Sequence, residues 1–176
     1  MTSKQILTFI ANDQTGLVNK MADAVADAGG NWLESSMSHL AGKFAGIALV
    51  EIDPDNQEQL ESNLAALQNS DLQVSLDSNY NEQPDEQERI LEVEVVAHDR
   101  PGIVRELTSL LSSLNVNVES LHTNRTVAAM SSEHLFEASA VVVLPSSLDE
   151  EGLRQHLETL SDDLMVELFD LDDNDE

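Results

Sequence analysis

Two segments of the chain are versions of one another. The sequence ILTFIANDQTGLV at residues 6–18 returns as EVEVVAHDRPGIV at residues 92–104, an offset of 86 positions. In both segments an extended apolar run ends at an Asp, a Gly follows three positions later, and two aliphatic residues come next. Because an internal repeat determines the architecture before any single element does, the sequence predicts two copies of one structural unit.

The match continues downstream, with an offset that changes in steps. Residues 34–35 match residues 119–120 at an offset of 85, and residues 44–54 match residues 135–145 at an offset of 91. Surface connections tolerate insertions. We therefore expect a one-residue slip just before the first of these matches, and about six added residues between positions 126 and 133 of the second copy.

Within each copy the apolar period changes in a fixed order. In the first copy the pattern predicts a strand, a helix, two strands, a helix and a strand, at residues 4–11, 17–28, 31–38, 43–52, 54–68 and 72–77. This β-α-β-β-α-β order is typical of a four-stranded antiparallel sheet with both helices on one face. The predicted fold class is α+β, with two ferredoxin-like units in tandem.

The composition between and after the copies sets the domain boundaries. We expect a first domain at residues 1–79, a polar linker at residues 80–88, a second domain at residues 89–170 and an acidic tail at residues 171–176. The tail is interpreted as a solvated chain end, with an interaction tail as the alternative.

The overall composition excludes several kinds of protein. The 176 residues include no cysteine, and 8 Lys plus Arg stand against 34 Asp plus Glu, for a formal charge of −26. Disulfide frameworks and thiolate chemistry are therefore excluded. A chain this acidic, with scattered cations, is not expected to bind nucleic acid directly. The longest apolar run, residues 140–144, is too short for a membrane span, so we expect a soluble cytoplasmic protein.

Motifs for catalysis and metal binding are not found in the sequence. The five His residues form no close pair, and there is no phosphate-binding loop or nucleophile motif. We therefore expect no metal, no cofactor and no catalytic residue. An enzyme that uses a pair of carboxylates is the weakest alternative, because abundant acids alone are poor evidence for one.

The most informative motif is Asp-x-x-Gly, between the first strand and the first helix of each copy. It occurs as Asp13 to Gly16 and as Asp99 to Gly102. Glycine permits close approach of a ligand, and the first amides of a helix can hold a carboxylate. Asp could accept from an ammonium group, so the loop suits an amino-acid zwitterion. The alternative is that each Asp is a helix N-cap.

An Asn lies fifteen residues after each Gly, as Asn31 and Asn117. Its side chain supplies both a donor and an acceptor to a ligand. The alternative is a turn residue between helix and strand.

Together, these loops, the element order and the Asn positions resemble the ACT domain, a small regulatory module that typically binds amino acids. The resemblance covers both copies, although Thr15 stands where the family prefers Pro, as at Pro101. It implies ligand sites between paired units, near the loop Gly and the second-strand Asn. The candidate ligand-binding residues are Asp13, Gly16, Leu17, Asn31, Asp99, Arg100, Gly102, Ile103 and Asn117.

The resemblance also implies a function. Two such units without a catalytic domain imply a non-enzymatic regulator that responds to glycine or serine and represses transcription. The implied partner is a DNA-binding activator of glycine cleavage genes. The alternative is a separate regulatory subunit of an amino-acid metabolic enzyme. Exposed strand edges invite pairing, so a homo-oligomer is left open.

Overall fold

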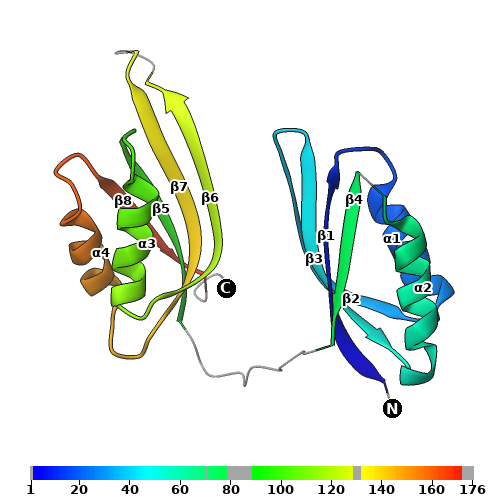
Figure 1. Ribbon diagram of the computed structural model, residues 1–176. Coiled ribbons are helices and arrows are strands. Elements are labelled where there is room, and N and C mark those ends of the chain that lie inside the picture. Colours follow the sequence, from blue (N-terminus) through cyan, green and yellow to red (C-terminus); the bar gives the residue numbers. More distant parts are fainter. Residues whose placement is uncertain (1, 70, 79–88, 129–131, 172–176) are drawn as a thin grey trace. The chain divides into compact units, whose positions relative to one another are not determined.

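The computed structural model describes residues 2–69, 71–78, 89–128 and 132–171. Contacts divide the chain into two compact units, Met1–Gln83 and Pro84–Glu176 (Figure 1). The linker and the acidic tail expected from the sequence fall outside the described residues, apart from Leu171. Among the described residues, no helix is both long and apolar enough to cross a membrane.

The first unit contains four strands and two α-helices. Its elements are β1 (Ser3–Asn12), α1 (Leu17–Asp27), β2 (Asn31–Leu40), β3 (Lys43–Ile52), α2 (Gln57–Leu67) and β4 (Leu72–Asp77). A short 3₁₀ turn, Pro54–Asn56, precedes α2. The strands form one antiparallel sheet in the order β2-β3-β1-β4.

The second unit repeats this arrangement. Its elements are β5 (Arg89–His98), α3 (Ile103–Ser113), β6 (Asn117–Val127), β7 (His134–Leu144), α4 (Glu150–Glu158) and β8 (Met165–Asp170). The antiparallel sheet has the order β6-β7-β5-β8. The ferredoxin-like α+β fold predicted from the sequence is therefore confirmed in both units.

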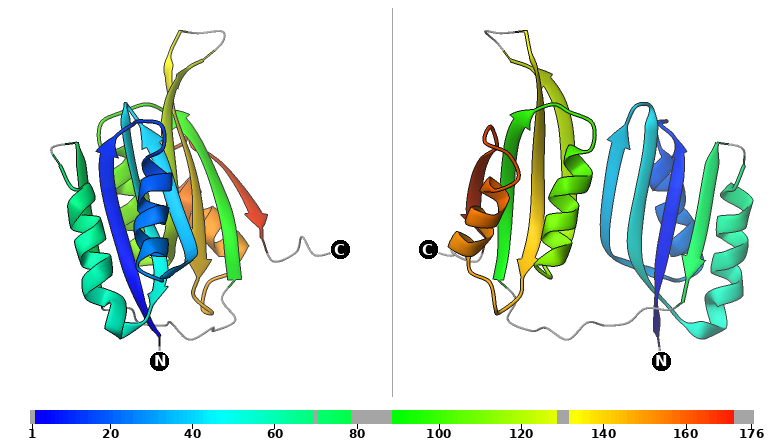
Figure 2. Two further views of the ribbon diagram at one scale, coloured as in Figure 1. Left: turned by 90° about the vertical axis from the view of Figure 1, so that its right-hand side faces the viewer. Right: turned by 60° about the vertical axis from the view of Figure 1, so that its left-hand side comes forward.

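Each unit has one core, between its sheet and its two helices. Side chains alternate between the faces of a strand, and Leu7, Phe9 and Ala11 of β1 are buried against the helices. The equivalent residues of β5 are Val93, Val95 and Ala97, also buried. The helices cover only this face of each sheet (Figure 2). Among the residues that the structure describes, the other face of each sheet carries no helix of its own unit.

The repeat offsets inferred from the sequence need two corrections. The expected one-residue slip is wrong, because β2 and β6 carry a β-bulge at the same position, after Trp32 and after Val118. The offset therefore stays at 86 along these strands. In the next strands the offset is 92 and not 91, since Phe44 and Phe136 pair with equivalent alanines of β1 and β5. A shift of one residue would place every side chain on the wrong face.

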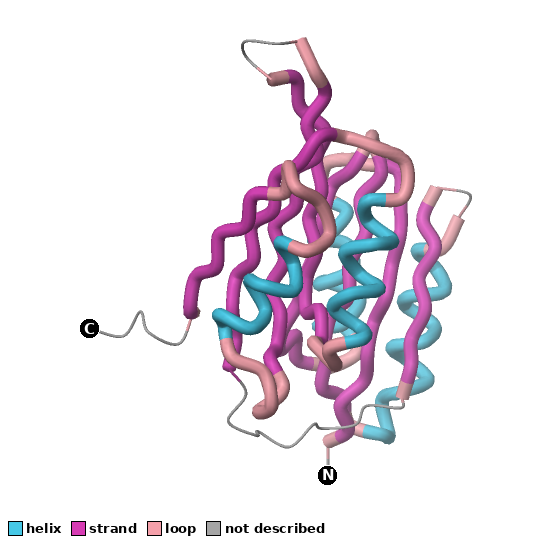
Figure 3. The backbone as a smooth tube through the Cα atoms, turned by 90° about the vertical axis from the view of Figure 1, so that its left-hand side faces the viewer, coloured by secondary structure: helices cyan, strands magenta, loops and turns pink. Residues whose placement is uncertain are grey.

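The insertion in the second copy lies in the β6–β7 hairpin. The offset rises from 86 to 92 across this connection, which agrees with the six residues expected from the sequence. The two strands project beyond the rest of their sheet (Figure 3). The shorter β2–β3 hairpin turns at Ala41 and Gly42, both with positive φ.

Candidate functional site

The loop that follows the first strand of each unit ends at a glycine. Gly16 and Gly102 occupy the N-cap positions of α1 and α3 with φ of 84° and 92°, in the left-handed region that favours glycine. No side chain caps either helix. The first amides of a helix have no intrahelical acceptor and lie at the positive end of the helix dipole. In the second loop one of them, the Ile103 amide, donates to the Arg100 carbonyl at 3.4 Å.

Asp13 and Asp99 connect these loops to the neighbouring hairpin and do not cap the helices. The Asp13 amide donates to the Gly42 carbonyl at 3.0 Å, and its carboxylate lies 3.5 Å from His39 Nε2. The Asp99 carboxylate lies 2.7 Å from Arg125 Nε. His39 and Arg125 are equivalent positions at the ends of β2 and β6, so the repeat preserves this connection.

The second loop contains an additional ion pair. Arg100 donates two hydrogen bonds to the Glu106 carboxylate, at 2.8 and 2.6 Å. These bonds lower the pKa of Glu106 and raise the pKa of Arg100. The first unit has Gln14 and Lys20 at the equivalent positions. The first turn of α1 therefore carries a cation where α3 carries a carboxylate.

Leu17 and Ile103, the other loop candidates, are buried in the cores. Their side chains therefore do not contribute to a site in the loop, and the Ile103 amide is already bonded to the Arg100 carbonyl. Asn31 and Asn117 are exposed at the first residues of β2 and β6, and Asn117 donates to the nearby Glu119 carboxylate.

The loop and the Asn of one unit lie at opposite ends of its sheet. Asn31 pairs with Glu51, close to the beginning of β1, whereas the loop follows Asn12 at the other end. A strand rises about 3.3 Å per residue, so the ends of β1 are about 30 Å apart. A single unit therefore does not bring its loop and its Asn into one site, and the same register separates them in the second unit.

A polar cluster beside the second loop was missed by the sequence analysis. The His98 amide and Nδ1 each lie 2.8 Å from Asp163 Oδ2, and Nε2 lies 3.3 Å from Glu133. These carboxylates raise the pKa of His98. Hydrogen bonds from Ser161 and His98 lower the pKa of Asp163. Sequence spacing gave no signal, because strand pairing brings the three groups together.

The first unit has an uncharged residue at the centre of the equivalent cluster. Asn12 donates to Asp71 at 2.7 Å and accepts from Lys43 Nζ at 2.6 Å. Lys43 thus lies at the same end of the first sheet as the Asp13 loop. In the part of the chain that the structure describes, no group of three or more His, Asp or Glu is placed to hold a metal ion.

Comparisons with known proteins agree with this architecture. Two family models, both described as the ACT domain, match residues 5–77 and 91–162. A crystal structure of an unknown protein from Galdieria sulphuraria is similar with a TM-score of 0.79 and 25% identity, covering 97% of this chain and 99% of that chain.

A second crystal structure carries the provisional name glycine cleavage system transcriptional repressor. Its TM-score is 0.72 at 18% identity, over 97% of this chain and 99% of that chain. At this identity the likeness shows a shared fold. No curated protein matches the sequence significantly.

Proposed function

Because the chain belongs to the ACT domain family, we propose that it is a non-enzymatic regulatory protein that binds glycine or serine and represses transcription through a DNA-binding activator protein. The observation that carries the proposal is the environment of the Asp13 to Gly16 loop. It combines helix amides that no side chain caps, the exposed Asp13 carboxylate, and the ammonium groups of Lys20 and Lys43 at the same end of the sheet, which together complement an amino-acid zwitterion.

The first loop is better suited to a ligand than the second. Lys20 lies in the first turn of α1, and that turn holds no acidic residue. In α3 the first turn holds Glu106, which compensates the helix dipole and occupies the Arg100 guanidinium, so that this cation is not available to a ligand carboxylate. The Asp99 carboxylate lies 2.7 Å from the Arg125 guanidinium, whereas the Asp13 carboxylate lies 3.5 Å from the His39 ring.

Pairing of units would complete the site. β2 and β6 are edge strands, and an edge strand can pair with another strand. If two such edges pair in antiparallel fashion, the first residue of one strand lies beside the last residue of the other. This arrangement would bring Asn31 or Asn117 to the loop of the paired unit, which is consistent with the sites between units that the family resemblance implies.

The charge of the chain supports action through a protein. A formal charge of −26 with 8 scattered cations opposes contact with the DNA backbone. The full-length similarity in fold to the provisionally named glycine cleavage repressor supports glycine as the first ligand to test.

The decisive experiment is a calorimetric titration of the full chain with glycine, serine and other amino acids, together with thermal shifts. Binding to the native state stabilises it by RT ln(1 + [L]/Kd), about 2.7 kcal/mol at a hundredfold excess over Kd. We expect Lys20→Gln to weaken binding about five- to tenfold, because a cation near the ligand carboxylate is lost.

Arg105→Gln is the matched control, since it removes one exposed cation near the second loop. It should leave the affinity unchanged. The proposal fails if no amino acid binds the native chain. An enzyme of amino-acid metabolism as the co-purifying partner would favour the regulatory-subunit alternative.

A further inference from the structure

The face of the second sheet opposite its helices is strongly acidic. Val93 and Val95 of β5 face the helices, so Glu92 and Glu94 project from the opposite face. The strand register places two further acids on that face, Glu137 of β7 and Glu167 of β8. Four carboxylates thus project from three adjacent strands.

This arrangement is costly for the sheet itself. Glu94 lies directly opposite Glu167, and like charges at such positions destabilise a sheet. The neighbouring contacts are with hydroxyls, from Ser139 to Glu92 at 3.0 Å and from Thr126 to Glu137 at 2.8 Å. Within the described parts of the chain, no Lys, Arg or His forms an ion pair with any of the four glutamates.

The first unit shows that the fold does not require these acids. The strand registers place Ile6, Thr8, Ala45 and Ser75 at the positions equivalent to Glu92, Glu94, Glu137 and Glu167. The first unit therefore forms the same sheet with uncharged residues at these four positions of its helix-free face. Acidic side chains at all four positions are a specific property of the second unit.

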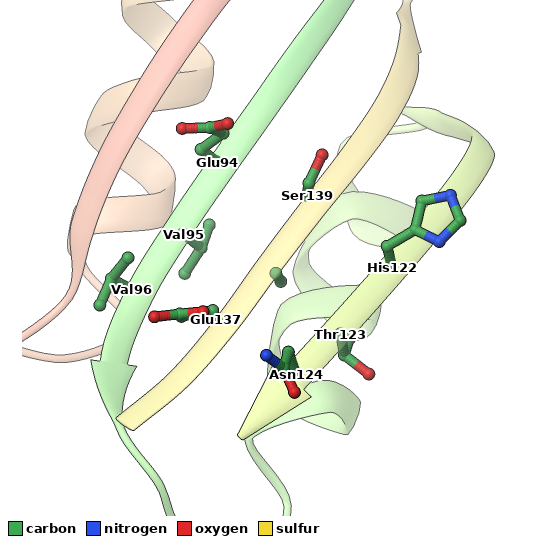
Figure 4. A pocket seen from close by; sticks show the side chains of 9 residues that line it. Glu94, Val95, Val96, His122, Thr123, Asn124, Glu137 and Ser139 are labelled. Atoms are coloured by element: carbon green, nitrogen blue, oxygen red, sulfur yellow. The ribbon is translucent and has the colours of Figure 1, made fainter. Parts of the chain in front are cut away.

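The acidic face also has a recess and exposed apolar side chains. A shallow pocket of about 310 Å³ lies across β5, β7 and β6, and its lining includes Glu94, Glu137 and His122 (Figure 4). On the same face of β8, Met165 and Phe169 are 63% and 45% exposed. The surface therefore offers both carboxylates and apolar contact area, beside a shallow recess.

We propose that this face of the second sheet docks a basic, amphipathic segment of a protein partner. The occupant follows from charge complementarity: Lys and Arg side chains would neutralise the four carboxylates, and apolar side chains would cover Met165 and Phe169. A second copy of this chain carries the same net charge of −26, and nucleic acid carries negative phosphates, so both would be repelled by the four carboxylates. The inference rests on the proposed function only in taking the partner to be a protein.

The test uses the full chain and a labelled synthetic amphipathic peptide of Lys, Leu and Ala with about six positive charges. Fluorescence anisotropy measures its affinity at low and at physiological salt. We expect the triple variant Glu94→Gln, Glu137→Gln, Glu167→Gln to bind about tenfold more weakly and to lose most of the salt dependence.

The matched control is the triple variant Glu58→Gln, Glu61→Gln, Glu158→Gln, which removes the same charge from helix surfaces. It should change the affinity less than twofold. Phe169→Ser should weaken binding at both salt concentrations, because an apolar contact is lost. The proposal is overturned if the peptide does not bind the unmodified chain, or if the two triple variants lose affinity equally.

Glycine titration of the same variants separates this proposal from the proposed function. The Glu94, Glu137, Glu167 triple variant should retain the glycine response of the unmodified chain. If glycine binds nowhere but the peptide distinguishes the two triple variants, the docking surface stands and the sensor role fails. If glycine binds and the peptide does not, the sensor role stands and the docking surface fails.

Discussion

The two units share a fold but differ where that fold leaves a position free to vary. The buried positions of β1 and β5, which face the helices, are apolar in both units apart from Gln5, as at Leu7 and Val93. On the sheet face opposite the helices, Ile6 in the first unit corresponds to Glu92 in the second. The alternation of the strands therefore fixes the inner residues, while the outer residues have diverged.

The loops differ in the same way. In the second unit, Arg100 and Glu106 satisfy one another, and Asp99 is paired with Arg125. In the first loop the Asp13 carboxylate makes a longer contact, 3.5 Å from the His39 ring. The charged groups of the second loop are thus paired with one another, whereas the first loop leaves its donors and acceptor more accessible. This difference supports a division of labour, with ligand binding in the first unit and partner docking in the second.

The largest expected effect is on the free energy of unfolding, and measuring it tests whether the two units unfold separately. Leu60 of α2 and Leu153 of α4 occupy equivalent, fully buried positions. Replacing either by Ala leaves a cavity, and we expect a loss of about 2–5 kcal/mol in the free energy of unfolding of that unit. Differential scanning calorimetry should show that Leu60→Ala shifts one transition and Leu153→Ala shifts another.

The exposed Leu40 is a suitable control, because Leu40→Ala should change stability by less than about 0.5 kcal/mol. If both buried variants shift a single common transition by the same amount, the units unfold cooperatively and the comparison of independent copies fails.

A smaller effect is expected where the core of the first unit departs from that of the second. Gln5 is buried at 1% exposure, and its Oε1 has no hydrogen-bond partner, whereas the equivalent Leu91 is apolar. An unsatisfied buried acceptor costs about 1–3 kcal/mol. Gln5→Leu should therefore stabilise the first unit by about 1 kcal/mol in chemical denaturation. Leu91→Gln in the second unit should destabilise it, and a destabilised Gln5→Leu variant would contradict this argument.

The repeated fold was predictable because its signal is local. The apolar alternation of β1 and the helical stripe that begins at Leu17 each lie within one short segment. The strand predicted at 72–77 has the observed bounds of β4. The bulges after Trp32 and Val118 were missed, because a β-bulge changes strand pairing without a distinctive residue.

Less of the candidate site could be predicted. The Asp-x-x-Gly spacing located both loops, and the glycine conformations explain why Gly stands there. The sequence could not show that Asp13 contacts His39, or that Asn31 lies at the opposite end of the sheet. These relations depend on strand register and hairpin length, which bring distant residues together.

A double exchange between the loops would test their difference directly. Gln14→Arg with Lys20→Glu gives the first loop the ion pair of the second. We expect about five- to tenfold weaker glycine binding, because the Lys20 cation is lost and the new carboxylate compensates the helix dipole. The control is the charge-reversed arrangement Gln14→Glu with Lys20→Arg, which keeps a cation at position 20 and should bind more tightly than the exchange. Equal affinities of the two variants, measured by calorimetry, would show that charge at position 20 is irrelevant.

The smallest effect concerns pH and the cluster around His98. The carboxylates of Asp163 and Glu133 raise the pKa of His98 above its ordinary value of 6.5. A group with a raised pKa in the folded state stabilises that state fully below about pH 6.5, and this contribution is lost as the pH rises through the higher folded pKa. The pKa of Asp163 is lowered, so its contribution is lost only in strong acid.

The second unit should therefore melt at a lower temperature at about pH 8 than at about pH 6. The variant His98→Asn, which copies Asn12 of the first unit, should flatten this dependence. An NMR titration of the His98 ring provides the direct measurement, and a midpoint at or below 6.5 would show that the cluster does not hold the protonated ring.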